Sequence, residues 1–148
     1  MTEVLFYHLQ RQPLEKVLPQ LLEKCLARGW RCVVQAASSE RVDALDTLLW
    51  TYSDASFLPH GTEREAEAAE TPVVLTTGPA NPNSAEVRFF VDGATGELEG
   101  YKRAIYLFDG NDPDAVEAAR DQWKEAQGEG FEVAYWRQDA DGRWQKQA

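Results

Sequence analysis

Short apolar runs alternate with amphipathic stretches along most of the chain. Runs rich in β-branched and aromatic side chains predict buried strands at 3–8, 31–36, 73–76, 86–91 and 104–108. Between the first two runs, apolar positions recur at spacings of three and four over residues 13–28, and Gly29 supplies a stop, which predicts a helix. Pro19 lacks a backbone N–H, so this helix either begins late, with Pro19 in its first turn, or kinks at Pro19.

Two further helices are predicted from their capping residues. Ser39 is a candidate N-cap for a helix through about residue 52, whose inward side chains are Val42, Leu45, Leu48 and Leu49. The next helix has the strongest end signals, because Asp112 can cap it and Pro113 suits its first position. Its end is marked by Gly128 and Gly130.

The remaining segments predict a hairpin and an acidic loop. Residues 131–138 and 143–146 flank the turn sequence at 139–142, which predicts an antiparallel hairpin. Residues 61–70 carry four acids and one base, so they predict a solvated loop or short helix without a packing face. We expect no function in that segment.

This order of elements predicts the fold class. Strands that alternate with helices are typical of an α/β protein with a mainly parallel sheet covered on both faces. We therefore expect one domain over residues 1–148, a three-layer Rossmann-like fold with a C-terminal antiparallel hairpin.

Composition narrows the possible partners. The chain has 25 acidic and 15 basic residues, a formal net charge of −10, so its overall field repels polyanions and disfavours nonspecific binding to nucleic acid. A local basic pocket stays compatible with that charge. No apolar run approaches the roughly 18 residues that a membrane span needs, and no signal peptide is recognisable. We expect a cytoplasmic protein that contacts no membrane.

The sequence lacks the usual signatures of catalysis. The turn after the first strand, residues 9–13, contains no glycine, and no P-loop occurs, so a phosphate cradle is missing. His8 and His60 are the only histidines, and neither belongs to a zinc-protease motif. Cys25 and Cys32 are interpreted as small buried hydrophobic residues rather than as disulfide or metal partners. We expect no catalytic residue, no metal and no cofactor.

One pair of cations stands out on the third helix. Helical spacing turns Val116, Ala119, Trp123 and Ala126 toward the core, with Arg120 and Lys124 one turn apart at the border of that stripe. Two interpretations stay open. The cations can form ordinary surface ion pairs with Glu117 and Asp121, or they can hold a carboxylate beside the flat indole of Trp123.

The chain resembles the chi subunit of bacterial DNA polymerase III, the replicative holoenzyme. The resemblance runs through most of the sequence and rests on the order and spacing of several short motifs. They are VLFY at 4–7, LW at 49–50, SFLPH at 56–60, FDGNDP at 108–113, ARDQWK at 119–124, GFEVAYW at 130–136 and DGRW at 141–144.

The resemblance implies a non-catalytic accessory subunit of the clamp loader, with a nucleotide-binding type of fold but no bound nucleotide. Chi proteins grip the acidic C-terminal tail of single-stranded DNA-binding protein, which ends in an aromatic residue with a free carboxylate. The tail-binding helix of the family carries an arginine, an aromatic residue and a lysine at the spacing of Arg120, Trp123 and Lys124. The matching position on the next strand is Tyr135.

Two details of the resemblance concern this chain in particular. Where the best-known chi has a further lysine near the start of this helix, this sequence has Val116, so the pocket is less basic. The psi subunit is the second partner of the family and connects chi to the other clamp-loader subunits. Its surface on chi would involve Phe57 and Leu58.

Two other functions remain as alternatives. One is a nucleotide- or flavin-binding α/β enzyme of unrecognised type. The other is direct binding of single-stranded DNA through exposed tryptophans, which needs a positive groove beside the rings. Residues 131–148 contain three acids and three bases, so this tail is neutral rather than basic.

Overall fold

The computed structural model of this protein describes residues 2–52, 58–65 and 67–147. Within them the chain forms an eight-stranded sheet with the order β3-β4-β2-β5-β6-β1-β7-β8. The strands are β1 (Glu3–Leu9), β2 (Cys32–Gln35), β3 (His60–Thr62), β4 (Val73–Thr76), β5 (Val87–Phe90), β6 (Arg103–Asp109), β7 (Glu132–Gln138) and β8 (Trp144–Lys146). The helices are α1 (Leu14–Ala27), α2 (Ser39–Thr51), α3 (Pro113–Gly128) and the short 3-10 helix η1 (Ala68–Glu70).

The predicted fold class is confirmed. Every described strand pair is parallel except β7 and β8, which pair antiparallel as the predicted hairpin. In the described part of the chain, no helix has the length and apolar character to cross a membrane.

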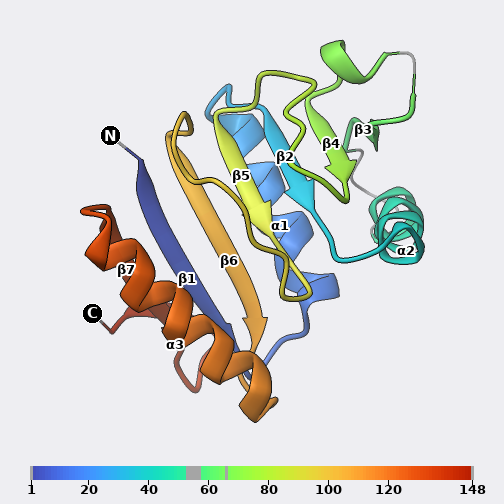
Figure 1. The fold of residues 1–148 in the computed structure, drawn as a ribbon. Helices are drawn as coiled ribbons and strands as arrows, with labels where there is room; N and C mark the ends of the chain where they lie inside the picture. Colours follow the sequence, from blue (N-terminus) through green and yellow to red (C-terminus); the bar gives the residue numbers. More distant parts are fainter. Residues whose placement is uncertain (1, 53–57, 66, 148) are drawn as a thin grey trace.

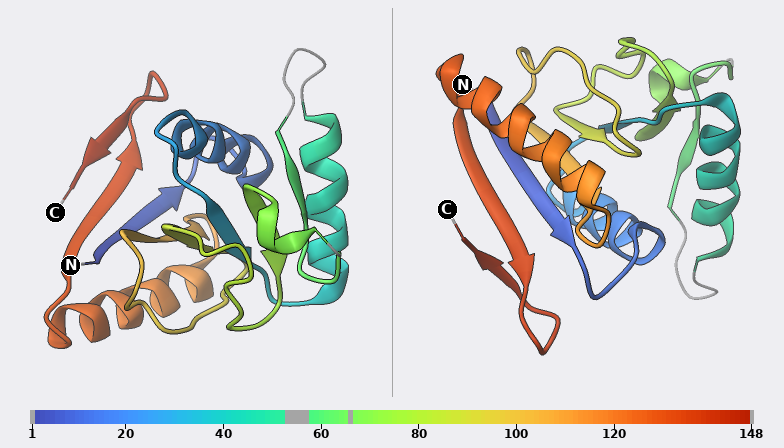
Figure 2. Two further views of the ribbon diagram at one scale, coloured as in Figure 1. Left: turned by 90° about the horizontal axis from the view of Figure 1, so that it is seen from above. Right: turned by 60° about the horizontal axis from the view of Figure 1, so that its bottom comes forward.

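Helices cover both faces of the sheet. The connection from β1 to β2 through α1 and the connection from β6 to β7 through α3 run in opposite directions across the sheet. Right-handed crossovers that run in opposite directions place their helices on opposite faces. Figure 1 shows α3 in front of the sheet and α1 behind it, and the left view of Figure 2 shows the sheet between them. The carboxyl ends of β1 and β6 therefore lie at the topological switch point of the sheet.

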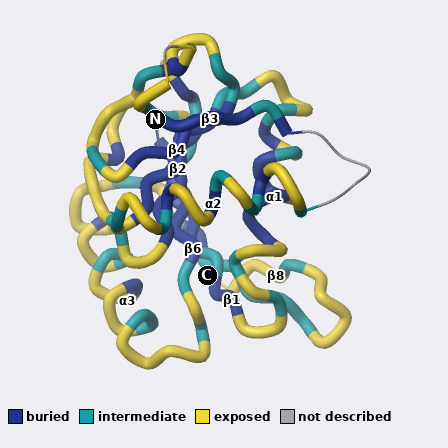
Figure 3. Tube along the Cα trace, turned by 90° about the vertical axis from the view of Figure 1, so that its right-hand side faces the viewer, coloured by how far each residue is buried: buried dark blue, intermediate teal, exposed yellow. Residues whose placement is uncertain are grey.

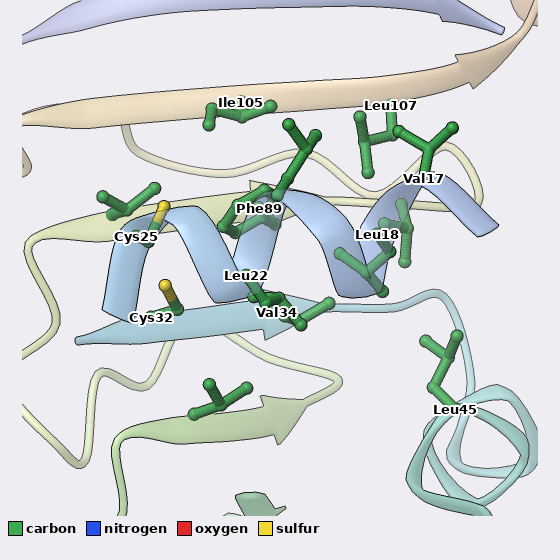
Figure 4. Packing of buried hydrophobic residues seen from close by; sticks show 14 of the residues in the cluster. Val17, Leu18, Leu22, Cys25, Cys32, Val34, Leu45, Phe89, Ile105 and Leu107 are labelled. Atoms are coloured by element: carbon green, nitrogen blue, oxygen red, sulfur yellow. The ribbon is translucent and has the colours of Figure 1, made fainter. Parts of the chain in front are cut away.

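Alternate side chains of the strands build two cores. On the α1 face, Leu5 of β1 joins a large cluster that includes Leu22, Val34, Phe89, Ile105 and Leu107 (Figure 4). On the α3 face, a smaller cluster contains Val4, Phe6, Phe90, Ala104, Tyr106, Ala119 and Ala126. Figure 3 shows that burial is concentrated in the strands, whereas the connecting loops are mostly exposed. The rows of side chains that face α3 supply the floor of the site described below.

The interpretation of the two cysteines is confirmed. Cys25 of α1 and Cys32 of β2 are free and buried, and their side chains lie beside each other in the larger core (Figure 4). A hydrogen bond between them and burial in an apolar environment raise the pKa of the Cys32 thiol. Both thiols therefore act as packing groups.

Three local predictions need correction. The N-cap of α2 is Ser38 rather than Ser39, and its hydroxyl accepts a hydrogen bond from the Arg41 backbone N–H at 3.2 Å. Helix α1 begins at Leu14, so the late start that would place Pro19 in the first turn is wrong, and Pro19 lies buried inside the helix. Residues 61–70, predicted as a solvated loop or short helix without a packing face, do contain the short helix η1, but they begin within the buried strand β3, which pairs with β4.

The predicted start of α3 is confirmed. The Asp112 carboxylate caps the helix by accepting a hydrogen bond from the Asp114 backbone N–H at 3.0 Å, and Pro113 occupies the first helical position. Gly130 follows the helix with φ of +87°, a conformation that glycine adopts without steric cost. Local sequence thus sets where α3 begins and where it ends.

Candidate functional site

Helix α3 carries three of the four predicted site residues. On the buried side of this helix, Ala119 and Ala126 pack against the sheet and are 4% and 2% exposed. Trp123 lies half-buried at the edge of this contact, where its ring meets Phe6 of β1 edge-on, with centroids 5.5 Å apart. Arg120 and Lys124 are exposed on consecutive turns of the helix beside it.

Strand β7 supplies the fourth residue. Tyr135 lies half-buried on the face of the sheet that α3 covers, and its ring meets that of Trp123 at 5.9 Å with an angle of 75° between the planes. The structure therefore brings the two predicted aromatic residues into contact. We call Arg120, Trp123, Lys124 and Tyr135 the α3–β7 site.

The two cations of the α3–β7 site are not engaged in direct ion pairs with described residues. Among the described residues, neither Arg120 nor Lys124 makes an ion pair, so the structure does not contain the surface pairs with Glu117 and Asp121 that one of the two interpretations assumed. The positive charge of Arg120 reaches Tyr135, where it acts against the rise in pKa that burial causes. No hydrogen bond or ring contact within the described part joins Lys124 to the other three residues.

Two aromatic residues that the sequence did not single out complete the wall of the site. His8 of β1 and Phe108 of β6 are register partners, and their rings meet edge-on at 5.1 Å. Phe108 also lies 6.1 Å from the Tyr135 ring. Because β1, β6 and β7 are neighbours only in the folded sheet, their proximity could be predicted only from the strand order.

His8 holds the Tyr135 side chain in place. The imidazole Nδ1 and the Tyr135 hydroxyl form a short hydrogen bond, and His8 is only 6% exposed. Burial lowers the pKa of His8, the positive charges of Arg137 and Arg120 lower it further, and the carboxylate of Asp109 acts in the opposite direction. These effects favour the neutral imidazole beneath the site.

A glycine makes room for this imidazole. A Cβ atom placed on Gly110 would lie 2.1 Å from the His8 ring, far inside van der Waals contact. Gly110 belongs to the motif FDGNDP at 108–113, between β6 and α3. The close approach of this turn to His8 explains why a residue without a side chain occupies that position.

The remaining predicted residues lie elsewhere. Val116, at the position where the best-known chi has a further lysine, is half-buried near the start of α3. Leu58 is 2% exposed and belongs to the larger core, so its side chain offers a partner almost no surface. Phe57 lies outside the residues that the structure describes.

A groove of about 750 Å³ opens at the topological switch point, between the β1–α1 turn and the start of α3. Five carboxylates and two guanidinium groups, those of Arg11 and Arg41, line it, and Arg41 is already paired with Asp92 at 2.7 Å. A phosphate would therefore meet a negative lining, in a place where the turn at 9–13 has no glycine. This geometry gives no support to a nucleotide- or flavin-binding enzyme.

His60 has a structural environment. Its side chain is fully buried, with Nδ1 2.7 Å from the Leu58 carbonyl oxygen and Nε2 3.1 Å from the Asp46 carbonyl oxygen. Within the described ranges, no group of three or more His, Cys, Asp and Glu side chains is arranged to hold a metal ion. In this part of the chain, His60 and the other potential metal ligands therefore give no second candidate site. The α3–β7 site, which combines cations with aromatic rings, is the surface best suited to binding a ligand.

Comparison with known proteins agrees with the sequence motifs. The family model for the DNA polymerase III chi subunit, HolC, matches residues 1–134. A protein named probable DNA polymerase III subunit chi, from Rickettsia prowazekii (strain Madrid E), is 31% identical over 87 residues, which are 59% of this chain and 53% of that protein. The chain thus spans about half the length of this curated relative. Because the family model covers nearly the whole chain, the protein belongs to the DNA polymerase III chi subunit family.

Proposed function

We propose that this chi-family chain is a non-catalytic accessory subunit that binds the acidic C-terminal tail of single-stranded DNA-binding protein at the α3–β7 site. By doing so it links the clamp loader to the coated template strand. One observation carries the proposal: two cations that make no ion pair with any described residue lie on α3 beside a contacting pair of aromatic rings, Trp123 and Tyr135.

The chemistry of such a tail matches this surface. A terminal carboxylate accepts charge-assisted hydrogen bonds from a guanidinium or ammonium group, each worth about 1.5–3 kcal/mol. A terminal aromatic ring gains about 0.5–1.5 kcal/mol beyond area burial when it packs against Trp123 or Tyr135. Only a free C-terminus supplies an α-carboxylate on the aromatic residue itself, which distinguishes a tail from an internal acidic segment.

The net charge of the protein affects the proposed complex in two opposing ways. The charge of −10 repels an acidic tail at long range, and this repulsion is screened within about 10 Å at 0.1 M salt. The contacts of Arg120 and Lys124 attract the tail at short range and also weaken with salt. We therefore expect a shallower salt dependence than two cations on a neutral protein would give.

The test is a titration of a fluorescent acidic peptide ending in Pro-Phe. Arg120→Ala should weaken binding about tenfold, and Lys124→Glu should weaken it more than Lys124→Ala because repulsion replaces attraction. Lys16→Ala is the matched control, since Lys16 is an exposed cation on α1, at the opposite face of the sheet. Wild-type affinity in Arg120→Ala, or equal affinity for the peptide with an amidated terminus, would contradict the site assignment.

The link to the clamp loader rests on the family to which the chain belongs. We propose that it runs through a psi-type subunit. Affinity capture with the purified chain should recover clamp-loader subunits together with single-stranded DNA-binding protein. Recovery of the clamp loader in the presence of excess tail peptide, with loss of the single-stranded DNA-binding protein alone, would separate the two surfaces.

A further inference from the structure

The α3–β7 site borders a row of side chains on neighbouring strands. His8 of β1 is the register partner of Phe108 on one side and of Arg137 on the other. Arg137 follows Tyr135 by two positions on β7, so its side chain leaves the same face of the sheet, toward α3. One terminal nitrogen of Arg137 donates to the Gln10 side-chain carbonyl at 2.6 Å, and the group makes no ion pair within the described residues.

One ring nitrogen of His8 forms a hydrogen bond, and the other has no hydrogen-bond partner among the described residues. Nδ1 shares a hydrogen bond with the Tyr135 hydroxyl, whereas the buried Nε2 has no hydrogen-bond partner among the described residues. A neutral imidazole carries its proton on either nitrogen. With the proton on Nε2, the Tyr135 hydroxyl donates to Nδ1. With the proton on Nδ1, the Tyr135 oxygen accepts, and its own proton can point out of the sheet toward a bound anion.

We propose that His8 and Arg137 complete the α3–β7 site, with Arg120 and Arg137 flanking a bound carboxylate and His8 orienting the Tyr135 hydroxyl toward it. This inference rests on the proposed function, because it names the inner part of the same tail site. The ligand class is a peptide carboxylate next to an aromatic side chain. His8 acts as a positioning residue, and Arg137 supplies a third cation from a different element.

Proton uptake on binding follows from the groups around His8. The imidazole faces Tyr135 and Arg137 from β7, Arg120 from α3 and Asp109 at the end of β6. The two guanidinium charges disfavour the imidazolium ion, and a bound carboxylate offsets them. The anion therefore raises the affinity of His8 for a proton. By linkage, the peptide binds more tightly as pH falls from 7.5 to 5.5, by up to about tenfold per pH unit.

The experiment is an NMR titration of the histidine ring protons of the full chain, with and without the acidic peptide. The chain has two histidines, and His60 on β3, at the far edge of the sheet, is an internal control. Saturation with the peptide should raise the apparent pKa of His8, whereas the peptide should not change the ring-proton signals of His60. Binding of the peptide without a change at His8 would overturn the inference.

Amino-acid substitutions test the roles of Arg137 and His8 independently of the NMR titration. Arg137→Gln should weaken peptide binding several-fold, whereas Arg143→Gln removes the same charge from the exposed turn before β8 and should not. His8→Asn keeps a polar group near Tyr135 but cannot titrate, so peptide binding should lose its pH dependence and should also be weaker than in the wild type at pH 7.5, because the imidazole no longer orients the Tyr135 hydroxyl. Equal effects of Arg137→Gln and Arg143→Gln would contradict the role of Arg137.

Failure of this inference can be told apart from failure of the proposed function. If Arg120→Ala weakens binding about tenfold while Arg137→Gln binds normally and His8 is unperturbed, the tail site stands and its extension to His8 and Arg137 is wrong. If the wild-type chain does not bind the peptide at all, both proposals are wrong.

Discussion

Tyr135 stands edge-on to Trp123, with ring centroids 5.9 Å apart and an angle of 75° between the planes. This contact connects strand β7 to the face of α3 that also packs on Phe6. One indole therefore belongs both to the smaller core and to the surface proposed to receive a peptide. Binding and stability should respond together when it is changed.

The first prediction concerns Trp123. Trp123→Ala should remove peptide binding and lower the free energy of unfolding by about 2–4 kcal/mol, because the indole is half-buried against two rings. Trp123→Phe should retain most of the stability and part of the affinity. Urea denaturation and peptide titration of both variants check this, and an alanine variant as stable as the wild type would show that the indole does not support the smaller core.

The second prediction concerns Gly110. Gly110→Ala places a methyl group 2.1 Å from the His8 ring and should cost about 1–3 kcal/mol of stability. Gly128→Ala is the control, since nothing lies within 4 Å of its added Cβ and alanine favours the helix by up to about 1 kcal/mol. The cost of Gly110→Ala should shrink in a His8→Ala background. Equal costs in both backgrounds would mean that His8 is not the obstacle.

The third prediction concerns Arg88, which is 1% exposed on β5. Its guanidinium donates to the Gln35 side-chain oxygen at 2.6 Å and to the carbonyl oxygens of Gly78 and Ala80 at 2.6 and 3.0 Å. Arg88→Ala should lower stability by about 3–5 kcal/mol, because these buried acceptors lose their donor and a cavity remains.

The matched control for Arg88 is another arginine in an exposed pair. Arg64 bonds to Asp43 at 3.1 Å with both side chains about two-thirds exposed, so Arg64→Ala should change stability by less than about 1 kcal/mol. Thermal and urea unfolding of the two variants measure the contrast. Similar losses in both would contradict the structural role of Arg88.

The fourth prediction is a pH dependence of stability that depends on His8. The folded state lowers the pKa of His8, chiefly by burial, so below about pH 6.5 the unfolded chain binds a proton that the folded chain resists. His8 should therefore destabilise the free protein as pH falls from 7 toward 5, by at most about 1.4 kcal/mol per pH unit. The comparison of wild type with His8→Asn isolates this contribution from the carboxylates, and identical pH profiles would contradict it.

Elements with strong local signals could be predicted from the sequence. The cap and first turn of α3 follow from Asp112 and Pro113, and the hairpin follows from the turn residues at 139–142. Strand β3 could not be predicted, because its three residues include Gly61 and lack an apolar pattern, and pairing with β4 creates their burial. Ser38 and Ser39 offer nearly equivalent caps, so one position of ambiguity was unavoidable.

The same distinction applies to the site. The proximity of Arg120, Trp123 and Lys124 could be predicted from their spacing on one helix. Tyr135 was predicted only through the resemblance to the chi family. The contributions of His8 and Phe108 depend on strand order, since β1 lies between β6 and β7 only after folding. A histidine in an apolar strand carries no local sign that its neighbour will be a tyrosine more than a hundred residues away.

The position of β1 in the sheet has a consequence for synthesis. This strand is made first, yet both its neighbours, β6 and β7, are made only after residue 102. At about 5–20 residues per second, translation leaves its edges unpaired for on the order of ten seconds. A nascent chain that stops before β7 exposes the apolar strand and lacks Tyr135. A truncated product is thereby open to chaperones and proteases and lacks one residue of the proposed tail site.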